Sequence, residues 1–563
     1  MENYRGVADL EIELDQTTVL IGENNTGKTS VLEALHSCMT RSLGRRAFPF
    51  TEYDFHITSA MSDPSGAPPL VLTLTFEESK KDEWPDEIAQ AFPSVMQTLD
   101  DDRQRITFRV SAKYEKTVKD FVVEWVFLDK DGNTLPTARQ AKLVLDLQLL
   151  SPVFLLTAVR DSSQYFQPKS SFWAPFTKNP QITEEKRKEI EEQIEQINQS
   201  VLDSHKPFEV VKAQLAKTGN LVPLAAKDLV SVEAVPARIF DMLARTQVKL
   251  ASTTGAKLPI SQHGSGTQSL AVLFLFEAFL QSRLAEAYDK NSEPILALEE
   301  PESHLHPSAI RAMWKTLEKL SGQKIIATHS GDLLASVPIF AIRRLARRHG
   351  KIEVFRVKSA TLSSSENLKV TYHIRSKRGS LLFARCWLLV EGQTDFTILP
   401  ELARMARSDF ESQGVACVEY AQCGLMPLIK VARDLGIEWH VLTDGDRAGK
   451  DYAGTATSLL GSDKPSDRIT TLSEDDIEHC MWNGGYSSVY EGVVDTKHRS
   501  AIKSSKGSSQ YVSETIDAAI NSTSKPYLAH AVIAEIEKSK PLNIPKALQE
   551  VIERAAKLAA SGS

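Results

Sequence analysis

Eight consecutive residues near the start of the chain form a pattern that binds phosphate. Gly22-Glu-Asn-Asn-Thr-Gly-Lys-Thr29 fits GxxxxGK[ST] without exception, between an apolar run at 18–21 and a helical pattern at 30–38. The glycines let backbone N–H groups curl around an oxyanion, and the start of the helix adds its positive dipole end. Lys28 would reach the β- and γ-phosphates of ATP, and the Thr29 hydroxyl would bind its Mg²⁺. The expected ATP contacts are Asn24, Asn25, Thr26, Gly27, Lys28, Thr29 and Ser30.

Two carboxylates and a histidine follow other apolar runs and are the expected partners of this loop. Glu299 and Glu300 come directly after the run at 295–298, and His329 follows the run at 324–327. Glu299 would lie near the Mg²⁺ of the nucleotide through water, and Glu300 would act as the base that orients the attacking water. His329 would donate to the γ-phosphate. The plainer alternatives are a solvated glutamate pair and a structural histidine.

A second anion-binding turn precedes the helical segment at 266–286. Ser265 and Gly266 stand where this helix would begin, so their N–H groups would face an anion. An ordinary helix cap is the alternative. If the turn binds ATP, the contacting residues are Ser265, Gly266 and Gln268.

Acidic side chains at the ends of two later apolar runs form a second candidate centre. Glu391 follows the run at 387–390, and Asp444 and Asp446 follow the run at 439–443. The three carboxylates would converge from adjacent strand ends and repel one another. Divalent ions relieve such repulsion, and hard oxygen ligands suit Mg²⁺ or Mn²⁺. A pair of acids in a surface loop is the alternative.

Two further acids are candidate ligands of the same ions. Asp395 lies four residues after Glu391, one helical turn along if a helix begins there, although an acid favoured by the helix dipole would look the same. Glu478 lies in an acidic segment after a short apolar run. His479 and Cys480 do not indicate zinc, because no other ligands have the required spacing. The expected metal ligands at this centre are Glu391, Asp395, Asp444, Asp446 and Glu478. Thr29 is the expected ligand of the separate Mg²⁺ that accompanies ATP.

The composition is that of a globular protein with several domains. The 563 residues predict about three or four domains. With 66 Lys and Arg against 73 Asp and Glu, the net charge of −7 argues against a protein that coats nucleic acid with its whole surface. No apolar stretch approaches the ~18 residues of a membrane span, and the first nine residues lack a signal peptide's apolar core. Five cysteines without a close pair indicate a reduced, cytoplasmic protein. We expect no membrane partner.

The order of the apolar segments predicts an α/β protein. The strand, loop and helix at 18–38 and the βα units after 387 and 439 indicate parallel sheets, whereas the segments at 70–76, 105–113 and 121–128 alternate like antiparallel strands. The charged helix at 184–203 is either half of a dimerisation hairpin or a solvated surface helix. The expected domains are a head in two parts (1–165 and 256–358), a helical insert (166–255), a linker (359–380) and a second α/β domain (381–563).

Together the first motifs resemble the ABC-type ATPase head of RecF and SMC proteins. In that family the signature turn of one protomer closes over ATP held by the Walker A loop of another, so the resemblance implies an ATP-bridged pair of heads. Phe154–Asp161 resembles the strand-end Arg-Asp segment of such heads, and Asp54-Phe55 lies where they place a short switch.

The sequence departs from that pattern at three places. The Walker B acid is Glu299 where Asp is usual, and the signature reads Gly-Ser-Gly-Thr-Gln rather than Ser-Gly-Gly-Gln. Asn3-Tyr-Arg-Gly6 resembles the turn that follows a first strand, and almost no residues precede it. We therefore expect that the edge strand is absent or that the start is misassigned.

The acidic centre resembles a Toprim domain, because Val390-Glu391-Gly392 is followed by Asp444-x-Asp446. A head followed by a Toprim domain resembles the OLD (overcoming lysogenization defect) nuclease family, an arrangement that Gabija-type and retron-associated OLD effectors share. The resemblance implies metal-dependent DNA cleavage controlled by nucleotide at the head, with two Mg²⁺ or Mn²⁺ ions at the Toprim site and one with ATP. It also implies antiphage defence, a homodimer or tetramer, and an operon partner such as a helicase or a retron component. The family places a basic residue in the nuclease site, and Lys525 is the best match, with a plain surface lysine as the alternative.

The residues favour two-metal hydrolysis of a phosphodiester, with ions ~4 Å apart, over two other interpretations. A RecF- or SMC-like clamp whose Toprim domain binds DNA or partners without cutting would not need three repelling carboxylates. A topoisomerase or a primase would need a catalytic tyrosine or a nucleotidyl-transfer fold, and neither stands out. The expected catalytic residues are Glu300, His329, Glu391, Asp444, Asp446 and Lys525. The expected contacts to the DNA backbone are Arg447, Lys450, Lys497, Arg499, Lys503 and Lys506.

Overall fold

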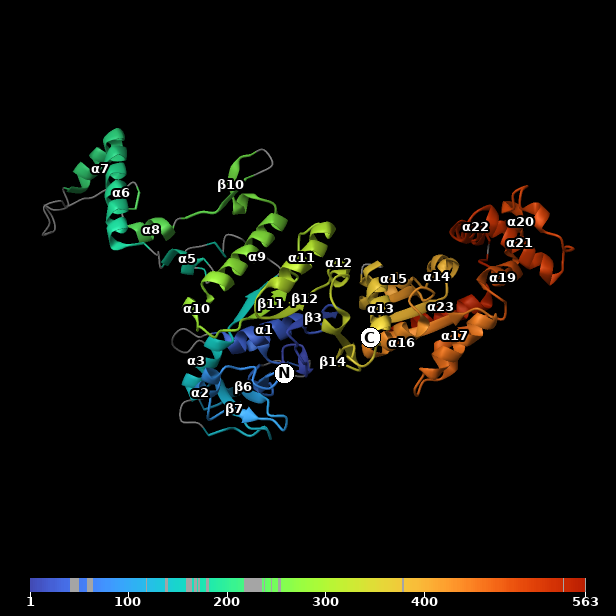
Figure 1. The fold of residues 1–563 in the computed structure, drawn as a ribbon, viewed down its shortest axis with the longest axis horizontal. Coiled ribbons are helices and arrows are strands. Elements are labelled where there is room, and N and C mark those ends of the chain that lie inside the picture. The colour runs from blue at the N-terminus through green and yellow to red at the C-terminus, as the bar shows by residue number, and fades with distance from the viewer. Residues whose placement is uncertain are drawn as a thin grey trace. The chain divides into compact units, whose positions relative to one another are not determined.

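The computed structural model describes most of the chain as two compact units (Figure 1). The first unit comprises Met1–Leu156, Pro294–Glu302 and Pro307–Ser563, and the second comprises Thr157–Glu293 and Ser303–His306. The described residues are 1–40, 50–57, 64–117, 119–136, 140–157, 165–166, 170, 173–178, 182–216, 235–236, 238–244, 246–251, 255–376, 379–539 and 541–561. The Arg-Asp pair of the expected strand-end segment, Arg160 and Asp161, lies outside them. In these ranges none of the helices has the length and apolar character that a membrane crossing requires.

A six-stranded, mostly parallel sheet in the first unit carries the phosphate loop. Its order is β14-β13-β3-β12-β11-β8, and only the β13–β14 pair is antiparallel. The strands are β3 (Thr17–Gly22), β8 (Val153–Leu156), β11 (Ile295–Glu299), β12 (Gln323–Ala327), β13 (Ile342–Arg348) and β14 (Lys351–Phe355). The inner strands are buried on both faces, which is why the sequence shows them as continuous apolar runs. Because β3, β11 and β12 are parallel, the residues that follow them meet at one edge of the sheet.

Helix α1 (Lys28–Met39) begins directly after the phosphate loop and covers this sheet. Its residues Val31, Leu32 and Leu35 are buried in the core that also holds Leu20 and Ala297. The other helices of this part of the chain are α2 (Asp86–Ala91), α3 (Gln140–Leu150), α11 (Pro307–Lys319) and α12 (Gly331–Leu334).

An antiparallel sheet packs into the same core, and its first strand corrects one expectation. The order is β2-β1-β4-β6-β5, with β7 on β6. The strands are β1 (Glu2–Tyr4), β2 (Val7–Asp9), β4 (Leu70–Glu77), β5 (Gln97–Thr98), β6 (Gln104–Glu115) and β7 (Asp120–Leu128). The first strand, which was expected to be absent, is present as β1; it is an inner strand that pairs with both β2 and β4, so the edge is β2. Three residues suffice because a two-residue turn closes the hairpin and buries Tyr4 and Val7.

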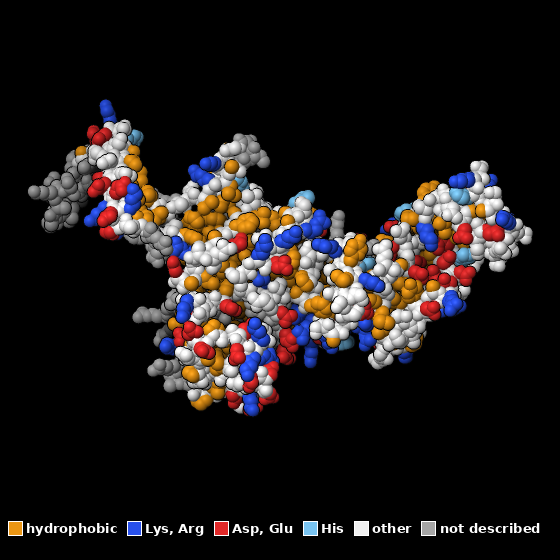
Figure 2. Space-filling model, viewed as in Figure 1, with side chains coloured by type: hydrophobic (Ala, Val, Ile, Leu, Met, Phe, Trp, Pro, Cys, Tyr) orange, Lys and Arg blue, Asp and Glu red, His pale blue; other side chains and the backbone are white. Residues whose placement is uncertain are grey.

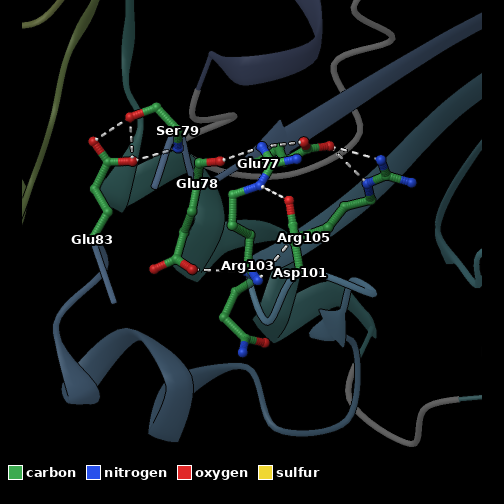
Figure 3. A network of polar contacts seen from close by, with 8 residues as sticks. Glu77, Glu78, Ser79, Glu83, Asp101, Arg103 and Arg105 are labelled. Atoms are coloured by element: carbon green, nitrogen blue, oxygen red, sulfur yellow. Dashed lines mark hydrogen bonds and ion pairs between the residues drawn. The ribbon is translucent and has the colours of Figure 1, made fainter. Parts of the chain in front are cut away.

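A network of acids and arginines joins the neighbouring ends of β4 and β6 (Figure 3). Glu77 pairs with Arg103 and Arg105, each at 2.7 Å. Glu78 is 1% exposed, and its two carboxylate oxygens accept from the backbone N–H of Trp84 and Gln104, at 2.7 Å each. A buried carboxylate satisfied in this way fixes the register of the sheet end, because a slip would leave its charge unpaired. We assign this network to the fold.

A four-stranded parallel sheet follows further along the chain. Its order is β16-β15-β17-β18. The strands are β15 (Cys386–Val390), β16 (Val415–Glu419), β17 (Glu438–Thr443) and β18 (Ile469–Thr471). The helices after β15 are α14 (Gln393–Met405), α15 (Phe410–Gln413), α16 (Leu425–Asp434), α17 (Arg447–Ser458), α18 (Pro465–Arg468), α19 (Ile477–Met481), α20 (Ser487–Val493), α21 (Ser509–Ser522), α22 (Lys525–Lys538) and α23 (Lys546–Ser561). Helix α23 packs on β15 and β17, and α14 packs on α22, so the end of the chain closes this core.

The segment expected as a linker, 359–380, is described at 359–376 and 379–380. It contains helix α13 (Ser364–Ser376), which packs against α16 through an ion pair of 2.9 Å between Glu366 and Lys430. Asp434 of α16 accepts from the backbone N–H of Lys358 at 2.9 Å. The domain limits from the sequence stay a prediction.

The second unit consists of helices and one two-stranded hairpin. Its described elements are α5 (Ala174–Lys178), α6 (Glu184–Ser204), α7 (Lys206–Ala216), α8 (Ile239–Ala244), β9 (Lys249–Ala251), β10 (Lys257–Pro259), α9 (Ser265–Ser282) and α10 (Leu284–Ala287). Thr183 caps α6, and Ile194 in the middle of its apolar stripe is buried, whereas Ile197 is 52% exposed. Dimerisation through this helix stays a prediction.

Candidate functional site

The phosphate loop has the expected position between β3 and α1, and its lysine lies folded onto the loop. The Lys28 ammonium donates to the carbonyl oxygens of Gly22 at 2.9 Å and Glu23 at 2.7 Å. Burial, partly offset by Glu300 and Glu23, lowers the pKa of Lys28 to about 8. Gly22 is required at the loop entrance, because it has φ +148° and a Cβ would lie 2.2 Å from the Leu345 carbonyl oxygen. A buried cation held only by backbone carbonyls is a ready partner for phosphate oxygens.

The partner groups expected from other strand ends lie beside this loop. The Thr29 hydroxyl donates to the Glu299 carboxylate at 2.5 Å, so both predicted ligands of the nucleotide's Mg²⁺ are in contact. Glu300 adopts φ +41°, a strained backbone for a residue that is not glycine, while its N–H donates to the Ala327 carbonyl at 2.8 Å. Burial and then the charge of Lys28 lower the pKa of His329. Its ring, stacked on Phe383 with centroids 6.4 Å apart, is therefore neutral at pH 7.

Replacing Lys28 with Ala is expected to weaken ATP binding about tenfold or more. One charge-assisted hydrogen bond contributes roughly 1.5–3 kcal/mol, and Lys28 is the one basic residue within the loop sequence 22–29. Titration with a fluorescent ATP analogue measures the change. Lys81→Ala, which removes an exposed ion pair with Asp102, is the control. Equal affinity of Lys28→Ala and the wild type would refute ATP binding at this loop.

The second anion-binding turn lies in the second unit and is built as a helix start. Ser265 is the first residue of α9, after Gly264 as its cap. A Cβ on Gly266 would lie 2.7 Å from the His304 carbonyl oxygen, so glycine is required there. The Gln268 amide donates to the His263 carbonyl at 2.7 Å. Ser265, Gly266 and Gln268 stay predicted ATP contacts.

Carboxylates gather at the carboxyl edge of the four-stranded sheet, as the sequence predicts. Glu391 follows β15 and Asp444 follows the neighbouring strand β17, since the two strands are parallel and paired. Asp446 caps α17 by accepting from the Gly449 N–H at 2.7 Å. Asp395, in the first turn of α14, accepts from the Gly392 N–H at 3.1 Å. Figure 2 shows acidic side chains concentrated over the region of α17 and α19.

Glu478 and Lys525 meet at the same place from later helices. Glu478 of α19 is 2% exposed and accepts from the Thr394 hydroxyl at 2.8 Å. The Lys525 ammonium at the start of α22 lies 3.3 Å from the Glu478 carboxylate. Burial would lower the pKa of Lys525, but Glu478, Asp476 and Asp395 outweigh it and hold this pKa above its ordinary value. Lys525 is therefore a permanent positive charge beside the acids.

The electrostatics of this edge favour the binding of cations, because its carboxyl groups have raised pKa values. Burial and then Asp395 and Glu391 raise the pKa of Asp444 to about 8. Burial is also the largest cause that raises the pKa of Asp395, to about 7, and that of Glu391. The sequence predicts repulsion among these carboxylates, and in the structure Glu391 and Asp444 follow the paired strands β15 and β17.

The donor set fits divalent metal ions. Glu391 Oε2 and Asp395 Oδ1 are buried and have no hydrogen-bond partner among the residues that the structure describes, which is costly unless a cation binds them. All five candidate ligands supply hard carboxylate oxygens, which Mg²⁺ and Mn²⁺ prefer. Within the described ranges no three acidic, histidine or cysteine side chains already surround one point in ligating geometry. The acids would therefore have to close around the ions.

Three contacts of this site escape the sequence patterns. Thr394 holds Glu478, and the buried hydroxyl of Tyr420 lowers the pKa of Glu391 through a hydrogen bond, against the effect of burial. Asp476 caps α19 and pairs with His479 at 2.6 Å. Of these residues only Thr394 could have been singled out from the sequence, because it lies three residues after Glu391 and in the first turn of α14.

Replacing Thr394 with Val is expected to weaken Mn²⁺ binding about tenfold. Valine keeps the shape of the side chain but removes the hydroxyl that donates to the buried Glu478. Contacts that support a metal ligand in this way contribute roughly 10–100-fold to metal affinity in proteins. Calorimetric titration in the Lys28→Ala background isolates this site from the head. Thr397→Val is the control, because its hydroxyl donates only to the Gln393 carbonyl of the same helix. An unchanged Mn²⁺ affinity in Thr394→Val would contradict the assignment of Glu478 as a ligand.

Comparison with known proteins agrees with this arrangement. Residues 1–381 match the family model described as Protein of unknown function (DUF2813), and residues 382–446 match Overcoming lysogenization defect protein-like, TOPRIM domain. The chain is 31% identical over 562 residues to the Uncharacterized protein YbjD of Escherichia coli K12, covering 99% of this chain and 97% of the relative. It is 26% identical over 471 residues to the OLD nuclease of Thermus scotoductus, covering 79% and 81%. It is 22% identical over 468 residues to Endonuclease GajA of Bacillus cereus, covering 82% and 76%.

The fold and the site define an ABC-type head followed by a Toprim domain, which is the arrangement of the OLD class and confirms the resemblance seen in the motifs. Within that class the chain belongs to the DUF2813 family.

Proposed function

We propose that this protein is a metal-dependent DNA endonuclease that cuts at the Toprim carboxylates and is regulated by ATP at the head. The observation that carries the proposal is the buried acidic cluster at the carboxyl edge of β15 and β17, with Lys525 beside it. In the described part of the chain, one oxygen each of Glu391 and Asp395 has no hydrogen-bond partner. Two relatives that span most of the chain bear the names OLD nuclease and Endonuclease GajA. A clamp that only binds DNA has no need for such a cluster.

The residues of the cluster would have two roles, metal binding and stabilisation of the transition state. Glu391, Asp395, Asp444, Asp446 and Glu478 would hold two Mg²⁺ or Mn²⁺ ions. Bound there, the ions would supply an activated water and neutralise the leaving 3′ oxygen. Lys525 would stabilise the extra negative charge that develops on the phosphate in the transition state. The DNA backbone would lie along the exposed residues Arg447, Lys450, Lys497, Arg499, Lys503 and Lys506.

The head would bind ATP with one Mg²⁺ through the phosphate loop and Glu299. Glu300 would orient water, and His329 would donate to the γ-phosphate. Ser265, Gly266 and Gln268 would close over the nucleotide of a second protomer, so the functional form would be a homodimer or a tetramer. We further propose a cytoplasmic role in antiphage defence, with an operon partner such as a helicase or a retron component.

Cleavage of supercoiled plasmid tests the proposal. Purified full-length protein is incubated with plasmid and Mg²⁺ or Mn²⁺, with EDTA, and with or without ATP. Nicked or linear product that requires the metal is expected. Failure to cut under any of these conditions, with ATP hydrolysis intact, would refute the nuclease and favour a RecF- or SMC-like clamp.

A further inference from the structure

An ion pair joins the phosphate loop to the first strand of the Toprim sheet. Glu23 is the second residue of the loop, and Arg385 directly precedes β15. The guanidinium of Arg385 donates to both carboxylate oxygens of Glu23, from Nε to Oε1 and from Nη2 to Oε2 at 3.0 Å. Such a two-point contact fixes orientation as well as distance. The pair therefore connects the nucleotide site to the strand that ends at Glu391.

The backbone of Arg385 is built into the amino edge of the Toprim sheet. Its N–H donates to the Gly414 carbonyl at 2.8 Å, next to the start of β16, and its carbonyl accepts from the Glu438 N–H at 2.9 Å, at the start of β17. A displacement of Arg385 therefore acts on three strands at once. Two of these strands carry Glu391 and Asp444 at their other ends.

A second, buried arginine makes the neighbouring joint rigid. Arg344 of β13 is 3% exposed and donates to the carbonyl oxygens of Ala384, Leu435 and Gly436 at 3.1–3.2 Å. Strand β13 pairs with β3, where Arg344 lies opposite Ile21 at the entrance to the phosphate loop. Because Arg344 cannot leave without exposing three buried carbonyls, this contact is a fixed point. The neighbouring Glu23–Arg385 pair is partly exposed, so it can open without leaving buried groups unpaired.

Glu23 also contacts Lys28, the residue whose position the phosphates of a bound nucleotide would change. Its carbonyl oxygen accepts from the Lys28 ammonium at 2.7 Å. Lys28 is the residue that the β- and γ-phosphates of a bound nucleotide would attract. Nucleotide binding would then remove one partner of the Glu23 backbone and bring negative charge close to its side chain.

We propose that the Glu23–Arg385 ion pair is a nucleotide-sensitive contact that transmits the state of the phosphate loop to the Toprim strands. The inference rests on the proposed function for its consequence, the control of cleavage, and on the contacts above for its existence. Since coupling between two sites is reciprocal, loss of the pair changes ATP affinity as well as the response of the Toprim domain to ATP. We expect the ATP affinity to change about two- to fivefold, because a partly exposed ion pair contributes little free energy.

Hydrogen exchange of the full-length protein tests the contact without relying on cleavage. Exchange of the peptide that contains residues 384–391 is followed with and without a non-hydrolysable ATP analogue. The wild type is expected to change its exchange rate in this peptide when the analogue binds, and Arg385→Gln is expected to lose that change. Arg356→Gln, which removes the ion pair between Arg356 and Glu13, is the matched control and is expected to respond like the wild type. Arg385 lies outside the phosphate loop, so its variant still binds the analogue.

Three outcomes would overturn the proposal. The exchange rate of the wild-type peptide does not change when the analogue binds, or Arg385→Gln shows the same change as the wild type. The third is that the Glu23→Gln/Arg385→Gln double variant loses the sum of what the two single variants lose of this change. A double variant that loses no more than either single variant supports it, because the two side chains then act as one unit. If no condition gives DNA cleavage but the exchange results hold, the proposed nuclease fails and the contact stands. If the protein cuts DNA and Arg385→Gln keeps the wild-type response of cleavage to ATP, the contact fails and the nuclease stands.

Discussion

Replacing Glu391 with Gln is expected to lower metal-dependent plasmid cleavage by at least about 10²-fold. Contacts that only support a metal ligand already contribute roughly 10–100-fold, and Glu391 is itself a predicted ligand. Glutamine keeps the shape of the side chain but removes the charge, and it places an amide where the unpartnered, buried Oε2 now lies. Cleavage rates are measured at saturating Mn²⁺, and ATP binding at the head is expected to be unchanged.

Glu411→Gln is the matched control, since it removes an exposed glutamate from the same domain. It is expected to cut at the wild-type rate. Cleavage by Glu391→Gln within about tenfold of the wild type would mean that the metal-binding acids lie elsewhere. A loss of ATP binding in this variant would indicate a folding defect instead of a local change.

Metal-free protein is expected to become less stable as the pH rises from about 4 to about 8, and Asp444→Asn is expected to remove much of this loss. The pKa of Asp444 is raised to about 8 in the folded protein, whereas an unfolded aspartate titrates near ~3.9. Between these values the folded state holds a proton that the unfolded state has released, so stability falls with rising pH. The asparagine variant is expected to gain roughly 2–4 kcal/mol at pH 8 without metal, because each pKa unit corresponds to about 1.4 kcal/mol and the coupled acids share the effect.

Thermal unfolding with EDTA at pH 5.5 and pH 8 measures this effect. Asp451→Asn, in the exposed part of α17, is the control and is expected to leave the pH dependence unchanged. Mn²⁺ is expected to stabilise the wild type at pH 8 far more than Asp444→Asn. Equal pH dependence of stability in Asp444→Asn and the wild type would mean that folding does not raise the pKa of Asp444.

Local pattern was enough to predict the loops and strand ends where the candidate site residues lie. The phosphate loop, Glu299 and the acids at 391 and 444 each follow an apolar run, and the buried parallel strands place such residues at one edge. Strand β1 was missed because three residues carry no periodicity, and its pairing partner β4 lies more than sixty residues away. Contacts between distant side chains, such as Thr394 with Glu478 and Arg385 with Glu23, depend on how the elements pack, which no local pattern encodes.

The way in which Arg344 reaches the Toprim domain has a consequence for how this architecture diversifies. All three of its acceptors are main-chain oxygens, so the hydrogen bonds themselves do not depend on which side chains stand at 384 and 435, although both positions are buried. Position 436 is restricted directly, because a Cβ on Gly436 would lie 2.6 Å from the ring of Phe355. A head with this arginine recognises the path of a backbone, not a particular sequence. Chimeras that graft another Toprim segment with a glycine at this turn onto the head should therefore keep the joint intact.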